Sequence, residues 1–140
     1  MTRVEISGSV PHFPQREIGA FTRRVLLTLE KLDRLDREVS EVSIAFVSDE
    51  AMKDLNRRYR HQNRTTDVLT FPGDAPLLGD IVISVDQARR QAADEKHSLP
   101  TEVRYLILHG ILHALGYDHE TDQGEMNALE VEVRGAVGLE

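Results

Sequence analysis

The segment of residues 101–115 constrains the fold of this chain most strongly, because at helical spacing it is apolar around nearly its whole circumference. One apolar stripe runs along the segment, and Leu108 and Leu112 lie on the opposite side. A helix of this kind is stable only where other elements cover it on all sides. Pro100 at a first helical position and Glu102 in the first turn indicate where it begins. The sequence therefore predicts a buried central helix.

The remaining segments predict the elements that would cover this helix. Alternating apolar and polar side chains, or short apolar runs between turn residues, predict strands over residues 3–7, 39–47, 66–71 and 80–85. Helical periodicity predicts further helices over residues 14–32, 51–59 and 87–96 and from about residue 122. The expected fold class is α+β, with one small mixed sheet of about four strands, about five helices and the helix of residues 101–115 packed on the sheet. The order of the strands is not predictable from the pattern.

The composition describes one globular domain over residues 1–140, with 40% apolar and 29% charged residues. The absence of cysteine excludes disulfides, thiolate zinc fingers, protein-held iron–sulfur clusters and a cysteine nucleophile. Metal chemistry would therefore depend on histidines and carboxylates. The first ten residues lack the apolar stretch of a signal peptide, and no segment has the length and apolarity of a membrane span. We therefore expect a cytoplasmic protein.

Three of the six histidines fall within the sequence HGILHALGYDH. His109 and His113 are one helical turn apart, so their rings project from the same face and can reach one ion. Gly116 can adopt the left-handed conformation that ends a helix, which allows the chain to return His119 to the same point. Three imidazoles with one open position are typical of a catalytic zinc site, although nickel, copper and iron also accept such ligands. The alternative is a set of hydrogen-bonded core histidines without a metal, which this spacing favours less.

The residue after the first histidine separates two kinds of metal chemistry. In the long metalloprotease motif a glutamate stands there as the general base, whereas this chain has Gly110. The carboxylate that activates the metal-bound water is therefore missing, which disfavours peptide hydrolysis by that mechanism. Peptide hydrolysis remains an alternative reaction for the same ligands.

The charges of the chain are unevenly distributed around its net charge of −7. Residues 52–64 carry five positive side chains against one negative, whereas residues 118–140 carry seven negative side chains against one positive. Arginines at a helix end are usually solvated. A planar guanidinium also suits a phosphodiester, so Arg57, Arg58, Arg60 and Arg64 could instead form a phosphate-binding surface. The charge pattern alone leaves both interpretations open.

Residues 109–120, HGILHALGYDHE, resemble the signature of the YbeY family of bacterial endoribonucleases, which act in ribosomal RNA maturation. The resemblance extends over about residues 55–130, and the first fifty residues add little to it. Further segments resemble the family's other blocks in the same order: LN at 55–56, YR at 59–60, TDVLTFP at 66–72, GDI at 79–81, and Ser84.

The resemblance implies a zincin-like fold and one zinc ion per chain on His109, His113 and His119. It also implies that Arg60 is functionally important. The implied activity is zinc-dependent, single-strand-specific RNA cleavage in maturation of the 3' end of 16S ribosomal RNA, and in ribosome biogenesis. Its expected partners are single-stranded RNA, ribosomal RNA and the small ribosomal subunit or ribosome-associated proteins, with neither a membrane nor DNA.

This chain departs from the family pattern at two positions: Asn63 replaces the usual Asp, and Ala114 replaces the usual Leu. The first leaves the role of a carboxylate in that loop open, and the second is a packing change on a helix.

We expect metal-assisted phosphodiester hydrolysis, with Arg60 holding the scissile phosphate. The general base is unassigned. Asp118 could orient a ligand ring or end a helix, and Asp67 and Asp80 could orient loops or cap strands. A non-catalytic, zinc-stabilised ribosome-binding module is a second alternative. His12, His61 and His97 are isolated in the sequence and are expected at the surface, without a role. 

Overall fold

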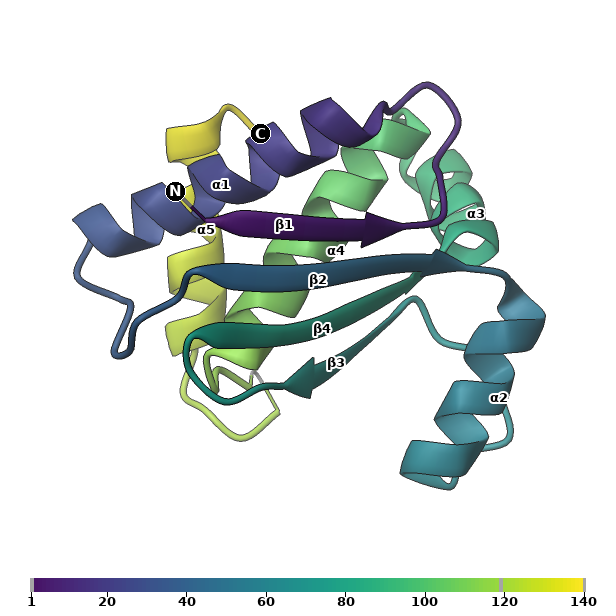
Figure 1. Cartoon of the computed structure of the whole chain (residues 1–140). Coiled ribbons are helices and arrows are strands. Elements are labelled where there is room, and N and C mark those ends of the chain that lie inside the picture. Colours follow the sequence, from purple (N-terminus) through teal and green to yellow (C-terminus); the bar gives the residue numbers. More distant parts are fainter. Residues whose placement is uncertain (1, 119, 140) are drawn as a thin grey trace.

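A mixed sheet forms the centre of the computed structural model, which describes residues 2–118 and 120–139 (Figure 1). In this part of the chain the strands lie in the order β1-β2-β4-β3. Their bounds are Arg3–Ser7 for β1, Glu41–Val47 for β2, Val68–Pro72 for β3 and Leu77–Ser84 for β4. β2 pairs in parallel with β1 and with β4, whereas β3 lies antiparallel to β4 at the edge of the sheet. The predicted α+β class with a small mixed sheet is therefore confirmed.

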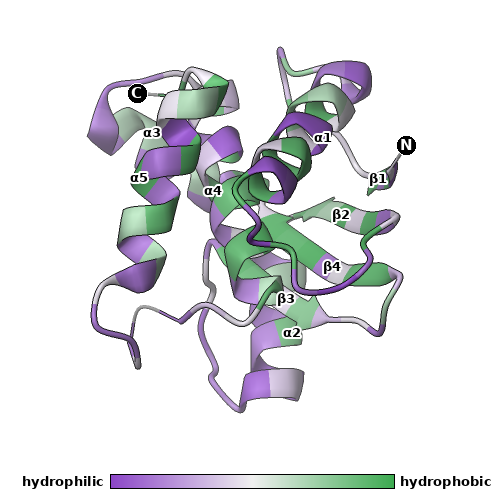
Figure 2. Cartoon of the chain, turned by 90° about the vertical axis from the view of Figure 1, so that its left-hand side faces the viewer, coloured by the Kyte–Doolittle hydropathy of each residue, from purple (hydrophilic) through white to green (hydrophobic). Residues whose placement is uncertain are grey.

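Helices cover the two faces of the sheet unequally. Their bounds are Gln15–Lys31 for α1, Asp49–Arg60 for α2, Val85–Glu95 for α3, Leu99–Ala114 for α4 and Glu125–Val137 for α5. α1 and α4 pack on one face, and α5 packs against both of these helices (Figure 2). α2 lies against the opposite face. In Figure 2 the hydrophobic surfaces of the helices point inward and the hydrophilic surfaces point to solvent, as burial of one apolar face requires.

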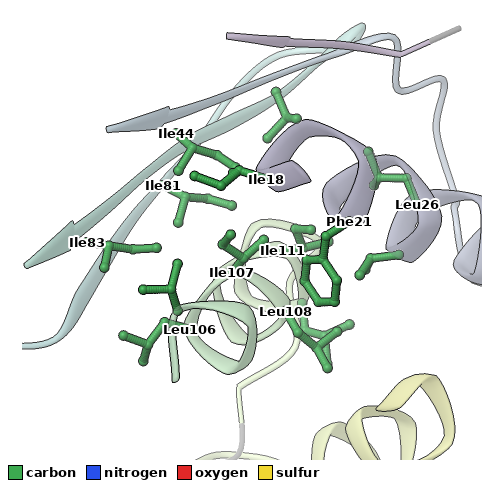
Figure 3. Close-up of a cluster of buried hydrophobic side chains, with 14 of the residues drawn as sticks. Ile18, Phe21, Leu26, Ile44, Ile81, Ile83, Leu106, Ile107, Leu108 and Ile111 are labelled. Carbon is green, nitrogen blue, oxygen red and sulfur yellow. The ribbon is translucent and has the colours of Figure 1, made fainter. Parts of the chain in front are cut away.

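The predicted central helix is α4, and it is the most deeply buried helix of the fold. Leu108 and Leu112, on one side of α4, are as fully buried as Ile107 and Ile111 on the other, each at 0% exposure. Figure 3 shows Ile107 and Ile111 pointing toward the strands and α1, while Leu108 points away from the sheet. The apolar circumference thus reflects contact with the sheet on one side and with neighbouring helices on the other. α4 is therefore a rigid base for any side chain that it carries.

Strand β3 separates two apolar clusters, since its successive side chains point to opposite faces. Leu69 belongs to a small cluster under α2, together with Met52 and Val82. Val68 packs against the main core, and the hydroxyl of Thr70 lies 3.5 Å from the carbonyl oxygen of Gly110. The edge of the sheet therefore lies directly beside the middle of α4.

Several element boundaries differ from the predicted ones. The connection between the predicted strands of residues 66–71 and 80–85 is shorter than expected, because β4 already begins at Leu77 and Gly79 pairs with Pro72 across the hairpin. α3 begins at Val85 rather than after Asp86, because the side chain of Ser84 caps the helix by accepting a hydrogen bond from the amide of residue 87. Asp86 instead accepts a 2.8 Å hydrogen bond from the amide of Asp49, which joins α3 to α2.

One histidine that was expected at the surface without a role, His97, instead contacts other side chains of the fold. His97 is half-buried, its Nε2 lies 2.6 Å from a carboxylate oxygen of Glu102, and its ring stacks on Tyr105. The prediction of an exposed His97 without a role was therefore wrong, while His12 and His61 are exposed as expected. None of the described helices is long and apolar enough to cross a bilayer.

Candidate metal centre

Two histidines of α4 converge on one point, as their spacing predicts. The Nε2 atoms of His109 and His113 lie 3.1 Å apart, and the ring centroids are separated by 4.6 Å with an angle of 67° between the planes. Zinc holds imidazole nitrogens at about 2.0–2.1 Å in tetrahedral geometry, which sets two ligand nitrogens about 3.3 Å apart. The observed separation is close to this value. The two side chains therefore fit a shared metal ion in both chemistry and spacing.

A carboxylate of α5 approaches the far side of the first ring. Oε1 of Glu130 lies 3.4 Å from Nδ1 of His109. A carboxylate at this nitrogen favours a proton on Nδ1 and leaves the lone pair on Nε2, the nitrogen that points toward His113. The sequence did not identify Glu130, and no local signal could have done so, since the contact depends on the packing of α5 against α4.

The third predicted ligand, His119, lies outside the described residues. The turn that precedes it is as predicted: Gly116 has a φ of +99°, and the amide of Tyr117 donates a hydrogen bond to the carbonyl of Leu112. A side-chain oxygen of Asp118 accepts a 3.0 Å hydrogen bond from the amide of Glu120. α4 therefore ends in a turn at Gly116.

A polar cavity of about 350 Å³ surrounds the two histidines, and we call it the histidine cavity. It lies between the end of α2, strand β3, α4 and the loop that follows α4. Its lining includes both histidines, Arg60, and the three carboxylate side chains of Asp67, Asp118 and Glu120. The structure thus brings Arg60 to the same cavity as His109 and His113, although about fifty residues separate them in the sequence.

The basic segment of residues 52–64 divides into two groups of arginines. Arg57 and Arg58 pair with Asp54 on the exposed side of α2, and the hydrogen bond from Arg57 holds the pKa of Asp54 below its usual value. Arg60 and Arg64 make no ion pair with any described residue, and both line polar cavities. Arg57 and Arg58 are therefore solvated residues at a helix end, whereas Arg60 and Arg64 are placed to bind an anion.

A hydrogen-bond network centred on Asp49 holds the loop that carries Arg64. The carboxylate of Asp49 accepts hydrogen bonds from Thr65 at 3.1 Å, Ser84 at 2.8 Å and Arg90 at 2.6 Å. Burial raises the pKa of Asp49, but the hydrogen bonds from Arg90, Ser84 and Thr65 outweigh it, so the pKa lies below its ordinary value. The network joins α2, the loop, β4 and α3.

Two of the three aspartates whose roles were left open, Asp67 and Asp80, line different cavities. Asp67 lines the histidine cavity, and its carboxylate accepts hydrogen bonds from the amide of Val68 at 2.7 Å and from the side chain of Gln91 at 3.2 Å. Asp80 instead lines an apolar groove under α2, together with Tyr59 and other residues. Of these two, only Asp67 is therefore placed to affect chemistry at the histidines.

The fold and the cavity together define a class of protein. An α+β chain that brings a histidine pair, an arginine and carboxylates into one cavity at the sheet edge has side chains that suit a hydrolase.

Comparison with known proteins identifies the family within this class. The endoribonuclease YbeY family matches residues 4–138 of the chain. A protein named endoribonuclease YbeY from Nautilia profundicola is 48% identical over 96 residues, which cover 66% of this chain and 69% of the relative. The protein of the same name from Desulfitobacterium hafniense is 39% identical over an alignment that covers 97% of this chain and 98% of the relative. The solution structure of TM1509 from Thermotoga maritima superposes with a TM-score of 0.61 at 28% identity, covering 96% of this chain and 88% of that one.

The chain belongs to the endoribonuclease YbeY family. The predicted family is thus confirmed, and with it the class of enzyme, a hydrolase of RNA phosphodiesters.

Proposed function

We propose that this chain is a zinc-dependent endoribonuclease that cleaves single-stranded RNA, with the metal held by His109, His113 and His119. The observation that carries the proposal is the 3.1 Å separation of the two Nε2 atoms in a cavity that Arg60 also lines. His119 enters as a ligand from the sequence spacing. Its neighbours Asp118 and Glu120 line the same cavity, which supports this assignment. 

The side chains in and beside the histidine cavity have different roles in the proposed cleavage. A zinc ion at the histidines would supply Lewis-acid polarisation of a phosphoryl oxygen and lower the pKa of a water molecule. Arg60 presents a planar fork of donors, with no described carboxylate paired to it, and can hold the scissile phosphate and offset charge in the transition state. Glu130 orients the ring of His109. 

The proton from the attacking water requires a general base, and the cavity offers three carboxylates for this role. Asp67, Asp118 and Glu120 line it together with the histidines. Asp67 is already fixed by hydrogen bonds from Val68 and Gln91, so its carboxylate is held in place without further ordering. We propose that the base comes from these three side chains.

The packing around Gly110 favours RNA over a peptide as the substrate. A Cβ built at Gly110 would lie 2.7 Å from Cγ2 of Ile81, so a side chain at this position would enter the sheet rather than the cavity. A glutamate after the first histidine, as in metalloproteases, therefore could not reach a bound water molecule without displacing the sheet. Peptide hydrolysis by that route is the weaker candidate.

Ribosomal RNA is the proposed substrate, specifically during maturation of the 3' end of 16S ribosomal RNA. This part of the proposal rests on the family and includes the small ribosomal subunit or its associated proteins as partners, cytoplasmic location, and one catalytic domain over residues 1–140. Co-sedimentation with small ribosomal subunits tests it: the chain is expected in the subunit fraction, and its absence from that fraction would contradict ribosome association.

Metal analysis tests the ligand assignment. The purified protein is expected to contain about one zinc ion per chain, and His113→Ala is expected to lose it. His12→Asn is the matched control, since His12 is exposed, lines no described cavity and has a φ of +63°, which asparagine tolerates. Normal zinc content in His113→Ala would refute the site.

Cleavage assays test the role of Arg60. Arg60→Gln is expected to slow cleavage of single-stranded RNA about 100-fold and to retain zinc, because it removes a contact to the charged transition state. Arg57→Gln removes the same charge from the same segment, but Arg57 pairs with Asp54 outside the cavity, so this control is expected to cleave normally.

Three results would contradict the proposed function. Unchanged cleavage in Arg60→Gln would exclude Arg60 from the reaction. Hydrolysis of casein by the zinc-loaded protein would favour a peptidase. Absence of metal-dependent RNA cleavage by the wild-type protein would favour the non-catalytic ribosome-binding module.

A further inference from the structure

A second polar cavity of about 380 Å³ adjoins the histidine cavity. Four residues line both cavities: Arg60, Thr66, Asp67 and Glu120. Beyond this shared wall, the second cavity is lined by the amide side chains of Asn56, Gln62, Gln87 and Gln91 and by Arg64, and we call it the amide cavity. The two cavities therefore form one continuous surface with Arg60 at their boundary.

Arg64 is a preorganised cation in the amide cavity. Its Nε donates a 2.8 Å hydrogen bond to the side chain of Gln62, and its carbonyl oxygen accepts a 2.9 Å hydrogen bond from the side chain of Asn56, which is only 3% exposed. No described carboxylate pairs with the guanidinium. Its terminal nitrogens can therefore contact a phosphate at little ordering cost.

Gln87 and Gln91 lie one turn apart on α3, on the same face of the helix. The side-chain oxygen of Gln87 accepts a 3.1 Å hydrogen bond from Nε of Arg90, and its NH₂ group has no partner among the described residues. In Gln91 the situation is reversed, because Nε2 donates to Asp67 and the side-chain oxygen is buried without a partner in the described chain. The pair thus offers donors to a ligand, namely the NH₂ group of Gln87 and the second N–H of Gln91, whereas the side-chain oxygen of Gln91 is buried.

This pattern of groups matches a nucleotide. The edges of nucleobases carry adjacent hydrogen-bond donors and acceptors, and amide side chains read such edges in unstacked single strands. The volume of the cavity is near the lower end of the range for small-ligand sites, which suits a single nucleotide.

We propose that the amide cavity binds the nucleotide that flanks the cleaved bond, with Arg64 on its phosphate and Gln87 and Gln91 on its base. The proposal rests on the proposed function, in which the scissile phosphate lies at Arg60 in the histidine cavity. It makes the enzyme sensitive to the identity of one base beside the cleavage position. It also favours single strands, whose bases can leave the stack.

Nucleoside monophosphates test this subsite independently of cleavage, because they contain no phosphodiester. We expect the four ribonucleoside 5'-monophosphates, added to the zinc-loaded protein, to shift the side-chain NH₂ signals of Gln87 and Gln91 in NMR spectra. Ribose 5-phosphate carries the same phosphate without a base. It is expected to bind about fivefold to tenfold more weakly than the preferred nucleotide, the effect of one or two hydrogen bonds.

Variants separate the base contacts from the phosphate contact. Gln87→Ala is expected to remove the preference for the nucleotide over ribose 5-phosphate, whereas Gln15→Ala, at the start of α1, is expected to keep it. Arg64→Gln is expected to weaken both compounds, and Arg57→Gln neither.

Two results would overturn the subsite: equal affinity of the wild-type protein for the nucleotides and ribose 5-phosphate, or a preference that survives in Gln87→Ala. These outcomes leave RNA cleavage untouched. Conversely, a protein that discriminates between the bases but cleaves no RNA would refute the proposed function and leave the amide cavity as a nucleotide-binding site without a cleaved bond beside it.

Discussion

Replacing Gly110 by alanine tests the packing that sets the position of the histidines. Gly110 lies on α4 between His109 and Ile111, where the helix meets strand β4. An added Cβ would lie 2.7 Å from Cγ2 of Ile81 and 3.3 Å from two further atoms of that side chain. Carbon atoms pack at about 3.5–4.0 Å, so the closest contact is about 1 Å too short. Ile81 is fully buried and β-branched, and it cannot rotate away cheaply.

Two opposing contributions determine how much Gly110→Ala changes the free energy of unfolding. Overpacking a core costs about 1–3 kcal/mol, whereas alanine gains about 1 kcal/mol over glycine in a helix interior. We expect Gly110→Ala to destabilise the protein by about 1–2 kcal/mol, since a 1 Å overlap with a rigid side chain lies toward the upper end of the packing cost. Because α4 must move away from β4, we also expect weaker zinc binding.

The chain provides a matched control in α1. A Cβ at Gly19 would meet only the end of the Arg23 side chain, at 3.1 Å, and this flexible group can move. Gly19→Ala should therefore stabilise the protein by about 0.5–1 kcal/mol through helix propensity. Urea unfolding followed by circular dichroism measures both changes. If Gly110→Ala were as stable as Gly19→Ala, the close approach of α4 to the sheet would not be the reason for a glycine at this position.

Three further variants probe other parts of the structure. Glu130→Ala should weaken zinc binding about 10–100-fold in competition with a chelator, because the ring of His109 loses its partner; unchanged affinity would show that Glu130 does not orient the ligand. Because the fold lowers the pKa of Asp49, its carboxylate stabilises the protein above the unfolded pKa of about 3.9, and this contribution disappears as pH falls through the lower folded pKa. Asp49→Asn should therefore be less stable near neutral pH and lose less stability on acidification in urea titrations, and parallel pH profiles would contradict this. Ile107→Ala should cost about 2–5 kcal/mol on unfolding through the cavity it leaves, and a cost under about 1 kcal/mol would mean that α4 is not tightly enclosed.

The parts of the fold that were predictable are those encoded by local patterns. α4 was identified from its apolar circumference, and its start differs by two residues because Ser98 caps the helix by accepting a hydrogen bond from the amide of Thr101. The order β1-β2-β4-β3 was not predictable, since it depends on pairing between strands that are distant in the sequence. The early start of β4 was not predictable for the same reason, because Leu77 belongs to the strand through its pairing with Glu41 of β2.

The candidate site divides in the same way. The convergence of His109 and His113 follows from one turn of helix and was predictable from spacing alone. That Arg60 rather than Arg57 reaches the cavity depends on where α2 ends, which is at Arg60, with His61 following in a left-handed conformation. Glu130 contacts His109 across 21 residues of sequence, through helix packing that no local pattern describes. Contacts between residues distant in the sequence therefore determine where several side chains of the site lie.

The side chains that line the histidine cavity carry a net negative charge, although the segment of residues 52–64 that contributes Arg60 is basic. Arg60 and the three carboxylates that line the cavity carry a formal charge of −2 with the histidines neutral. A phosphodiester would therefore be repelled by these side chains alone, in spite of Arg60, and a divalent cation at the histidines would bring the cavity to about neutrality. In the proposed function, RNA binding at this cavity and metal binding are thus coupled through charge. Of the five positive side chains in residues 52–64, only Arg60 and Arg64 line the two adjoining cavities, where we propose that a single strand binds.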